Sequence, residues 1–396
     1  MKTSEWIALA DKYVMKTYNR FPIVVKKGEG AHLWDTEGHC YLDFVSGIAV
    51  CSLGHSHPIV VDAIKKQVEI LTHVSNLYHI EAQIFLAKLL VENSFADKVF
   101  FCNSGAEANE AAIKLARKFA HQNFGVEKSE LITMQNSFHG RTLATVTATG
   151  QEKYKIGFEP WPPGFVYVPF DNLSALNDAV NEKTYAVMLE PIQGEGGVVI
   201  PSDDYLKGVR KICDDHAILL ILDEVQVGMG RTGKLFAYEH EGVIPDIVTL
   251  AKAMGNGFPM GAMLATDKVA SAFGPGNHAS TFGGNPLAMA AGLATLETIL
   301  GDGILDNCRT VGAFFFQRLH ELKLKHAIIK NVRGRGLIMG MELTIEGGEI
   351  VRKCMERKAL INCTNGNILR FVPPLIITEA DVDELVDILD EVMVAL

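Results

Sequence analysis

Between about residues 60 and 270 the chain alternates short apolar runs with segments of helical periodicity, and this alternation constrains the fold most. The apolar runs predict strands at 98–102, 130–135, 185–190, 217–223, 246–252 and 261–266. Segments 106–122 and 205–216 between them predict helices. Such alternation is typical of an α/β fold whose mainly parallel sheet is covered by helices on both faces. We therefore predict a large α/β domain over residues 51–289.

The two ends of the chain follow a different pattern. Residues 20–50 predict short strands separated by glycine turns, and an apolar helix is predicted at 286–300. Two further strand regions and a last amphipathic helix follow, with Thr378 and Asp381 as the expected N-terminal cap of that helix. We predict that residues 1–50 and 290–396 together form a smaller α+β domain.

Composition excludes several classes of function. The 396 residues are 48% hydrophobic, which is enough for a full core, and the net charge of −10 disfavours nucleic acid or an anionic membrane as partner. The strongest apolar run, 217–222, is too short to cross a bilayer, and residues 1–18 lack the apolar core of a signal peptide. Seven cysteines without a CxxC motif suit a reducing compartment. We expect a cytoplasmic protein.

Polar or small residues end or directly follow five of the predicted strands. Ligands of open α/β sheets bind at the carboxyl ends of the strands, so these segments are expected to share one edge. They are NSGA (103–106), NSFHGR (136–141), PIQGEGG (191–197), DEVQVG (223–228) and Lys252. One acid after a strand is usually a cap or turn residue, whereas five such segments together favour a binding site.

These segments offer four complementary chemical groups. The small-residue turn 103–106 opens a helix, whose free N–H groups and dipole attract phosphate. Asp223 follows a long apolar run, so its carboxylate is expected to be buried and to need a cationic partner. Lys252 also ends an apolar strand, and desolvation would make it a nucleophile. With Phe138 and His139 as flat rings for stacking, these groups are those that pyridoxal phosphate (PLP) requires.

Six segments resemble, in order, the signature segments of class III (subgroup II) aminotransferases of PLP fold type I. They are residues 100–117, 136–142, 190–198, 222–233, 250–262 and 280–286. The resemblance covers residues 18 to 390, nearly the whole chain. Segments 73–83, 101–118 and 360–378 are most similar to the acetylornithine aminotransferase branch of that family.

The resemblance implies a role for each of several residues around the cofactor. Lys252 would form the Schiff base with PLP and then shuttle the proton, and Asp223 would keep the pyridine nitrogen protonated. Phe138 would stack on the ring and Gln226 would reach its phenolic oxygen. The phosphate would be held by Ser104, Gly105 and Ala106, and by Thr281 of a neighbouring subunit. This arrangement implies a homodimer with its sites at the subunit interface.

The resemblance also implies how the substrates bind. Arg141 would hold the carboxylate remote from the reacting amine, and Arg370 the α-carboxylate of glutamate. Glu195 would pair with Arg370 for one substrate and release it for the other. Further predicted pocket residues are Tyr18, Asn76, Tyr78 and Ser280.

The implied reaction is ping-pong transfer of the terminal amino group of N-acetylornithine to 2-oxoglutarate. It gives N-acetylglutamate 5-semialdehyde and glutamate, as in arginine biosynthesis, and succinyl-diaminopimelate of lysine biosynthesis is a second candidate donor. No metal is expected.

Several alternatives stay open at this stage. Within the family these are ornithine or 4-aminobutyrate aminotransferase, although Ile48 stands where the ornithine enzymes carry a pocket tyrosine. An aminomutase or a catalytically silent PLP-binding protein would share the fold. Residues 228–233 match GxGxxG, but DEVQ separates them from their strand, which argues against a dinucleotide site. His55 and His57 lack a third metal ligand at suitable spacing, so a turn before Pro58 explains them better.

Overall fold

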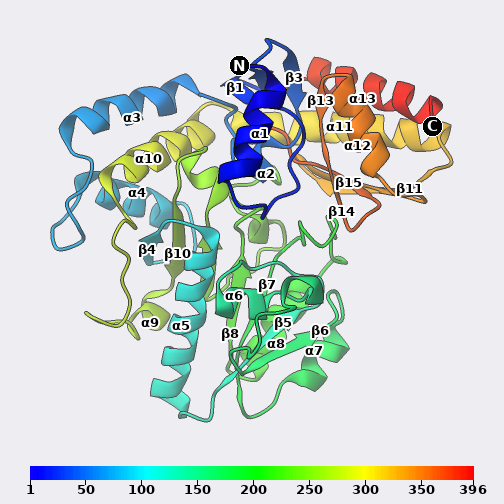
Figure 1. Cartoon of the computed structure of the whole chain (residues 1–396). Helices are drawn as coiled ribbons and strands as arrows, with labels where there is room; N and C mark the ends of the chain where they lie inside the picture. The colour runs from blue at the N-terminus through cyan, green and yellow to red at the C-terminus, as the bar shows by residue number, and fades with distance from the viewer.

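The computed structural model describes residues 1–396 and is built around a seven-stranded sheet (Figure 1). The strands from β9 through β8, β7 and β5 to β6 are parallel, and β10 runs antiparallel to both of its neighbours. Their spatial order is β4 (Lys98–Cys102), β10 (Gly261–Ala265), β9 (Ile247–Leu250), β8 (Leu219–Asp223), β7 (Thr184–Leu189), β5 (Glu130–Met134) and β6 (Phe165–Val168). The prediction of an α/β fold with a mainly parallel sheet is confirmed.

The central strands are mostly apolar because both faces of the sheet are covered. All residues of β7 and β8 are buried. Leu219 and Ile221 pack into the cluster formed with α5 (Gly105–Phe124), whereas Leu220 and Leu222 join the larger cluster on the opposite face. The helices flanking the sheet also include α3 (Pro58–Ile70), α4 (Glu81–Glu92), α6 (Leu143–Ala148), α7 (Leu173–Ala179), α8 (Tyr205–Asp215), α9 (Asp267–Ala270) and α10 (Pro286–Gly301).

The two ends of the chain meet in a second region, at the top of Figure 1. One sheet has the order β1 (Val25–Glu29), β2 (His32–Asp35), β3 (Cys40–Asp43) and β13 (Ala359–Leu360), and the other β11 (Ile329–Arg335), β12 (Ile338–Leu343), β15 (Ile368–Phe371) and β14 (Asn362–Thr364). The pairing of β13 with β3 joins the two ends in one sheet. The helices here are α1 (Thr3–Tyr13), α2 (Ser46–Ala49), α11 (Ile304–Lys325), α12 (Gly348–Glu356) and α13 (Glu379–Val394).

The sequence predicted the N-terminal cap of the last helix correctly, but it did not predict every short strand. Thr378 caps α13 as predicted, since its hydroxyl accepts from the N–H of Asp381 at 3.3 Å. Strand β6 was not predicted, because its four residues follow the proline-rich stretch 158–164 and carry no periodicity of their own. No single helix has the length and apolar composition to cross a membrane; α10 and α11 meet that criterion only when taken together, and they meet at 66°. The domain limits stay a prediction.

Candidate active site

The carboxyl ends of the parallel strands surround a pocket of about 370 Å³. This is the edge at which open α/β sheets bind ligands. Nine of the predicted site residues line it: Ser104, Gly105, Ala106, Phe138, Arg141, Glu195, Asp223, Gln226 and Lys252. They come from the ends of β4, β5, β7, β8 and β9, so the sheet topology brings together segments up to 148 positions apart (252 − 104).

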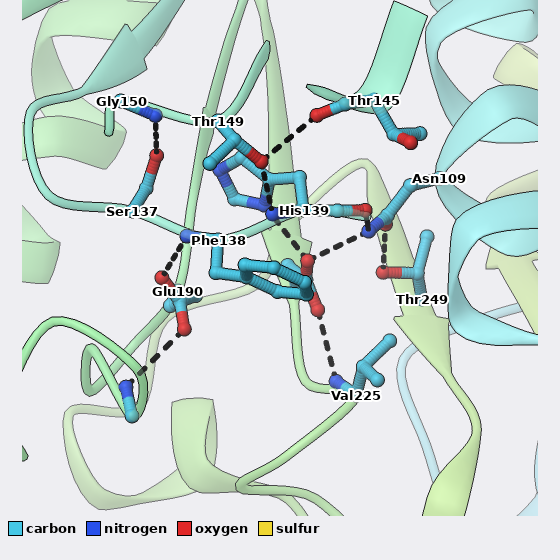
Figure 2. Close-up of polar contacts among 12 residues, drawn as sticks. Asn109, Ser137, Phe138, His139, Thr145, Thr149, Gly150, Glu190, Val225 and Thr249 are labelled. Atoms are coloured by element: carbon cyan, nitrogen blue, oxygen red, sulfur yellow. Dashed lines mark hydrogen bonds and ion pairs between the residues drawn. The ribbon is translucent and has the colours of Figure 1, made fainter. Parts of the chain in front are cut away.

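Asp223, at the end of β8, lies at the centre of a buried hydrogen-bond network, whose partners Asn109, His139 and Val225 are labelled in Figure 2. Its Oδ2 accepts from Asn109 Nδ2 at 2.7 Å and lies 2.8 Å from His139 Nδ1, and its Oδ1 accepts from the N–H of Val225 at 3.0 Å. Asn109 is itself fixed by Thr249, whose hydroxyl donates to Asn109 Oδ1 at 2.6 Å. With only 3% of Asp223 exposed, the network holds this carboxylate in one orientation.

His139 and Asn109 are residues whose contacts the sequence did not predict. His139 was expected to offer a flat ring for stacking, but its side chain is buried against Asp223. Asn109 lies one turn inside α5, where the sequence pattern does not distinguish it from an ordinary helix residue. A buried Asn on an otherwise alanine-rich helix face is the signal that could have revealed it, because buried amides need partners.

Lys252 follows β9 immediately and begins the short 3₁₀ helix η3 (Lys252–Gly255). Its φ of 44° is unusual for a residue with a side chain, and such backbone conformations concentrate at functional sites. Burial lowers the pKa of the Lys252 ammonium, although Glu195 raises it in part. The amine is therefore more easily deprotonated than a surface lysine.

Glu195, Arg370 and Gln226 form a second cluster beside Lys252. Arg370 comes from β15, and its Nη1 lies 2.5 Å from Glu195 Oε1 and 3.3 Å from Gln226 Oε1. Gln226 Nε2 donates to the same Glu195 oxygen at 3.2 Å. Burial alone would raise the pKa of Glu195, but Arg370 and Lys252 outweigh it and the pKa is lowered. Glu195 is therefore an ionised partner that occupies Arg370.

The turn between β4 and α5 leaves backbone donors free at the pocket. Ser104 is the N-cap of α5, and its hydroxyl accepts from the N–H of Glu107 at 3.2 Å. The N–H groups of Gly105 and Ala106 lie in the first turn, where no intrahelical acceptor exists. A Cβ on Gly105 would come within 2.8 Å of Val225, so glycine allows this turn to approach the β8 loop. The turn can hold an anion through N–H groups and the helix dipole.

Glu190, directly after β7, is a pocket residue that the sequence reading did not single out. Its Oε2 accepts from the N–H of Phe138 at 3.0 Å and its Oε1 from the N–H of Gly194 at 3.2 Å (Figure 2). Burial raises the pKa of Glu190 to about 7, with His139 and the two N–H donors opposing the effect. One carboxyl group thus ties the Phe138 segment to the turn that carries Glu195.

Other predicted residues lie outside the pocket within this chain. Ser280 Oγ accepts from Asn103 Nδ2 at 3.1 Å at the pocket edge, while Thr281 is exposed. Asn76 Nδ2 donates to the carbonyl of Gly283 at 2.8 Å. Tyr78 and Tyr18 are 65% and 74% exposed, and Tyr18 lines a separate hollow in the N-terminal segment.

The GxGxxG match and the His55–His57 pair both have structural explanations. Residues 228–233 form turns, and the element that follows is the 3₁₀ helix η2 (Ala237–His240) rather than the long helix of a dinucleotide fold. Within this segment Arg231 is fully buried, and its Nη2 donates to Ser52 Oγ at 3.1 Å. His55 Nε2 lies 2.7 Å from Asp43 Oδ2, which accounts for that histidine.

Comparison with known proteins decides the family. The family model of class-III aminotransferases matches residues 13–393. The chain belongs to this family. The acetylornithine aminotransferase of Caldanaerobacter subterraneus subsp. tengcongensis is 56% identical to this aminotransferase over 388 residues, 98% of each chain.

Solved structures agree with that assignment. An ornithine aminotransferase from Toxoplasma gondii, described with partial occupancy of PLP at its active site, superposes with a TM-score of 0.97 at 34% identity, covering 100% of this chain and 94% of that one. An acetylornithine aminotransferase from Elizabethkingia anophelis gives a TM-score of 0.90 at 33% identity, with both chains covered completely. The protein is a PLP-dependent aminotransferase.

The residues present fit that cofactor. The turn at Ser104 offers N–H donors for a phosphate, Asp223 offers a fixed buried carboxylate for a ring nitrogen, and Lys252 offers an amine for the aldehyde. All three line the same pocket.

Proposed function

We propose that this aminotransferase transfers the terminal amino group of N-acetylornithine to 2-oxoglutarate, in arginine biosynthesis. Support comes from curated relatives at 50% identity or more that are named acetylornithine aminotransferase, such as that of Methanocaldococcus jannaschii, which is 52% identical over 394 residues. The observation that carries the proposal is the Glu195–Arg370 pair beside Lys252. Glu195 can stay paired with Arg370, or it can leave Arg370 free to bind a carboxylate of the substrate.

PLP, when bound, supplies an aldehyde that condenses with amines and a ring that accepts an electron pair. With the cofactor bound, Asp223 would orient the ring by holding the proton at its nitrogen. Lys252 Nζ, freed by the incoming amine, would take the proton from the substrate carbon that carries the amine and return it two atoms away, on the other side of the amine nitrogen. Phe138 would cover one face of the ring and limit access of water.

The two arginines divide substrate recognition between them. N-acetylornithine has no carboxylate next to its terminal amine, so Glu195 stays paired with Arg370 while Arg141 binds the distant carboxylate. Glutamate carries two carboxylates, so Glu195 releases Arg370 for the one next to the amine, and Arg141 takes the other.

We further propose a cytoplasmic homodimer whose sites lie at the subunit interface. Several large apolar side chains are exposed in the single chain, among them Leu77 at 84% and Phe282 at 60%. The segments that carry these two residues lie side by side, since Asn76 Nδ2 donates to the carbonyl of Gly283 at 2.8 Å. Exposed apolar groups that lie together are typical of interfaces. All seven cysteines are free, which fits a reducing compartment.

A panel of half-reactions tests the substrate assignment. Holoenzyme is mixed separately with N-acetylornithine, ornithine, 4-aminobutyrate and succinyl-diaminopimelate, and kcat/KM is measured for the amine half-reaction. We expect the kcat/KM of N-acetylornithine to exceed those of ornithine and 4-aminobutyrate by about tenfold or more, because a buried polar group left without its partner costs roughly 1–3 kcal/mol. A higher value for either of these two would contradict the proposal.

A labelling experiment tests the role of Lys252. Borohydride reduction of holoenzyme followed by peptide mapping should place the cofactor on Lys252, and the Lys252→Ala variant should yield no labelled peptide. Label on another lysine would overturn the assignment.

A further inference from the structure

Arg141 differs from the other pocket arginine in what holds its side chain. Arg370 is 1% exposed and is fixed by Glu195, Gln226 and Asn362. Arg141 is exposed, and none of the hydrogen bonds or ion pairs of the chain involves its guanidinium. An unpaired arginine on a surface normally samples many rotamers, which costs binding energy when it must be ordered.

Aromatic rings take the place of polar partners at Arg141. Its guanidinium carbon lies 3.9 Å from the centroid of the Tyr154 ring and 5.5 Å from that of Phe138. Both distances fall within the range of cation–π attraction. The ring of Tyr154 is nearly perpendicular to that of Phe138, at 86° and 5.8 Å between centroids. Tyr154 therefore contacts both the arginine and the ring predicted to stack on the cofactor.

The ring of Tyr154, rather than its hydroxyl, makes these contacts. Tyr154 ends the 3₁₀ helix η1 (Glu152–Tyr154), is partly buried, and its hydroxyl takes part in no hydrogen bond of the chain. The neighbouring Lys153 Nζ lies 4.9 Å from the same ring. Tyr154 thus gathers two cations at the pocket mouth without neutralising either one.

Stacking on a ring is a suitable way to orient an arginine that must bind an anion. A guanidinium carries its five N–H donors in its plane, so a ring against its face leaves the donors free. A carboxylate partner would fix the side chain equally well but would compete with the substrate. We propose that Tyr154 is a positioning residue that orients Arg141 for the remote carboxylate of the substrate. This inference rests on the proposed function.

The test compares two donors that differ only in that carboxylate. N-acetylputrescine is N-acetylornithine with the carboxylate replaced by hydrogen, so the ratio of their kcat/KM values measures carboxylate recognition. The variants are Tyr154→Leu and Tyr154→Gln, which both remove the aromatic ring. One of them is sufficient for the test, provided that it folds. Tyr154→Phe is the matched control, since it keeps the ring and removes only the unused hydroxyl. Calorimetry with glutarate on each holoenzyme provides a binding measurement without turnover.

We expect removal of the ring to lower the preference for N-acetylornithine by about three- to fivefold through KM, as expected for an exposed cation–π contact. N-acetylputrescine should be unaffected, glutarate should bind more weakly by a similar factor, and Tyr154→Phe should stay within about twofold of the parent. In an Arg141→Ala background, loss of the ring should have no further effect.

Two outcomes would overturn the inference: an equal loss for both donors, or a loss that persists without Arg141. A parent enzyme that fails to prefer N-acetylornithine over N-acetylputrescine would instead contradict the proposed function. The two failures are therefore distinguishable.

Discussion

Two parts of the pocket are built in opposite ways: its floor, formed by Asp223 and Lys252 at the ends of strands, and its mouth, where Arg141 lies. At the floor, Asp223 is 3% exposed and is fixed by Asn109, His139 and Val225. At the mouth, Arg141 is exposed and contacts only aromatic rings, and Thr281, next to Ser280 at the pocket edge, is exposed as well. The floor is finished within one subunit, whereas the mouth is left open to substrate and, in our proposal, to a second subunit.

This difference follows from the topology. The floor residues follow strands of a parallel sheet, so their backbone positions are set by the most buried part of the core. Residues at the mouth come from turns that begin farther from the strands. We infer that the floor determines the chemistry of the reaction and that the mouth determines which carboxylate-bearing amine is used.

The largest expected effect is a loss of kcat on substitution of Asp223, at the floor of the pocket. Asp223→Asn keeps the shape of the side chain but removes the negative charge that we propose faces the cofactor. We expect kcat to fall by about 10²- to 10³-fold, the loss typical of removing one preorganised electrostatic partner. Steady-state kinetics at saturating cofactor measures it.

The adjacent residue provides a matched control for that variant. Glu224 is equally buried, but it accepts from the N–H groups of Ala237 and Tyr238 and does not line the pocket. Glu224→Gln should lower stability and leave kcat nearly unchanged. A similar loss of kcat in both variants would show that burial of an acid, rather than its position at the pocket, is what matters.

A second effect concerns stability and involves Glu190. Because its folded pKa is raised from 4.5 to about 7, the folded protein binds its proton more tightly than the unfolded chain does. This contribution is present below about pH 4.5 and is lost as the pH rises to about 7, which corresponds to about 3 kcal/mol. The free energy of unfolding, measured by urea denaturation, should therefore fall more steeply over this window in the parent than in Glu190→Gln. Parallel pH profiles for the two proteins would contradict the raised pKa.

The floor was largely predictable from the sequence, and its contacts were not. Asp223 and Lys252 end long apolar runs, so their place at the sheet edge followed from periodicity alone. The partners of Asp223 did not follow, because Asn109 and His139 lie 114 and 84 positions away and meet it only through sheet order. Glu190 gave no separate signal, because a single acid at the end of a strand is usually a cap or turn residue.

The mouth was less predictable, since its residues lie in turns without periodic signal. Tyr154 belongs to a three-residue 3₁₀ helix, and nothing in its sequence neighbourhood indicates that its ring meets Arg141. Tyr18 was expected in the pocket but is 74% exposed in the N-terminal segment. In our proposal Thr281 acts across the subunit interface, which the fold of one chain does not determine.

The smallest expected effect is on cofactor affinity and comes from Thr281, which tests whether a second subunit completes the mouth of the pocket. Thr281→Ala removes one hydroxyl, and the loss of one hydrogen bond to the phosphate should weaken cofactor binding by about five- to tenfold. The affinity is read from the dependence of the rate on PLP concentration.

Hybrid dimers then show which subunit uses the Thr281 hydroxyl. In a dimer of one Thr281→Ala subunit and one Lys252→Ala subunit, the only site with Lys252 receives an intact Thr281 from its partner. If the mouth is completed across the interface, this site should bind PLP as the parent does, whereas a hydroxyl acting within its own subunit would leave the defect in place.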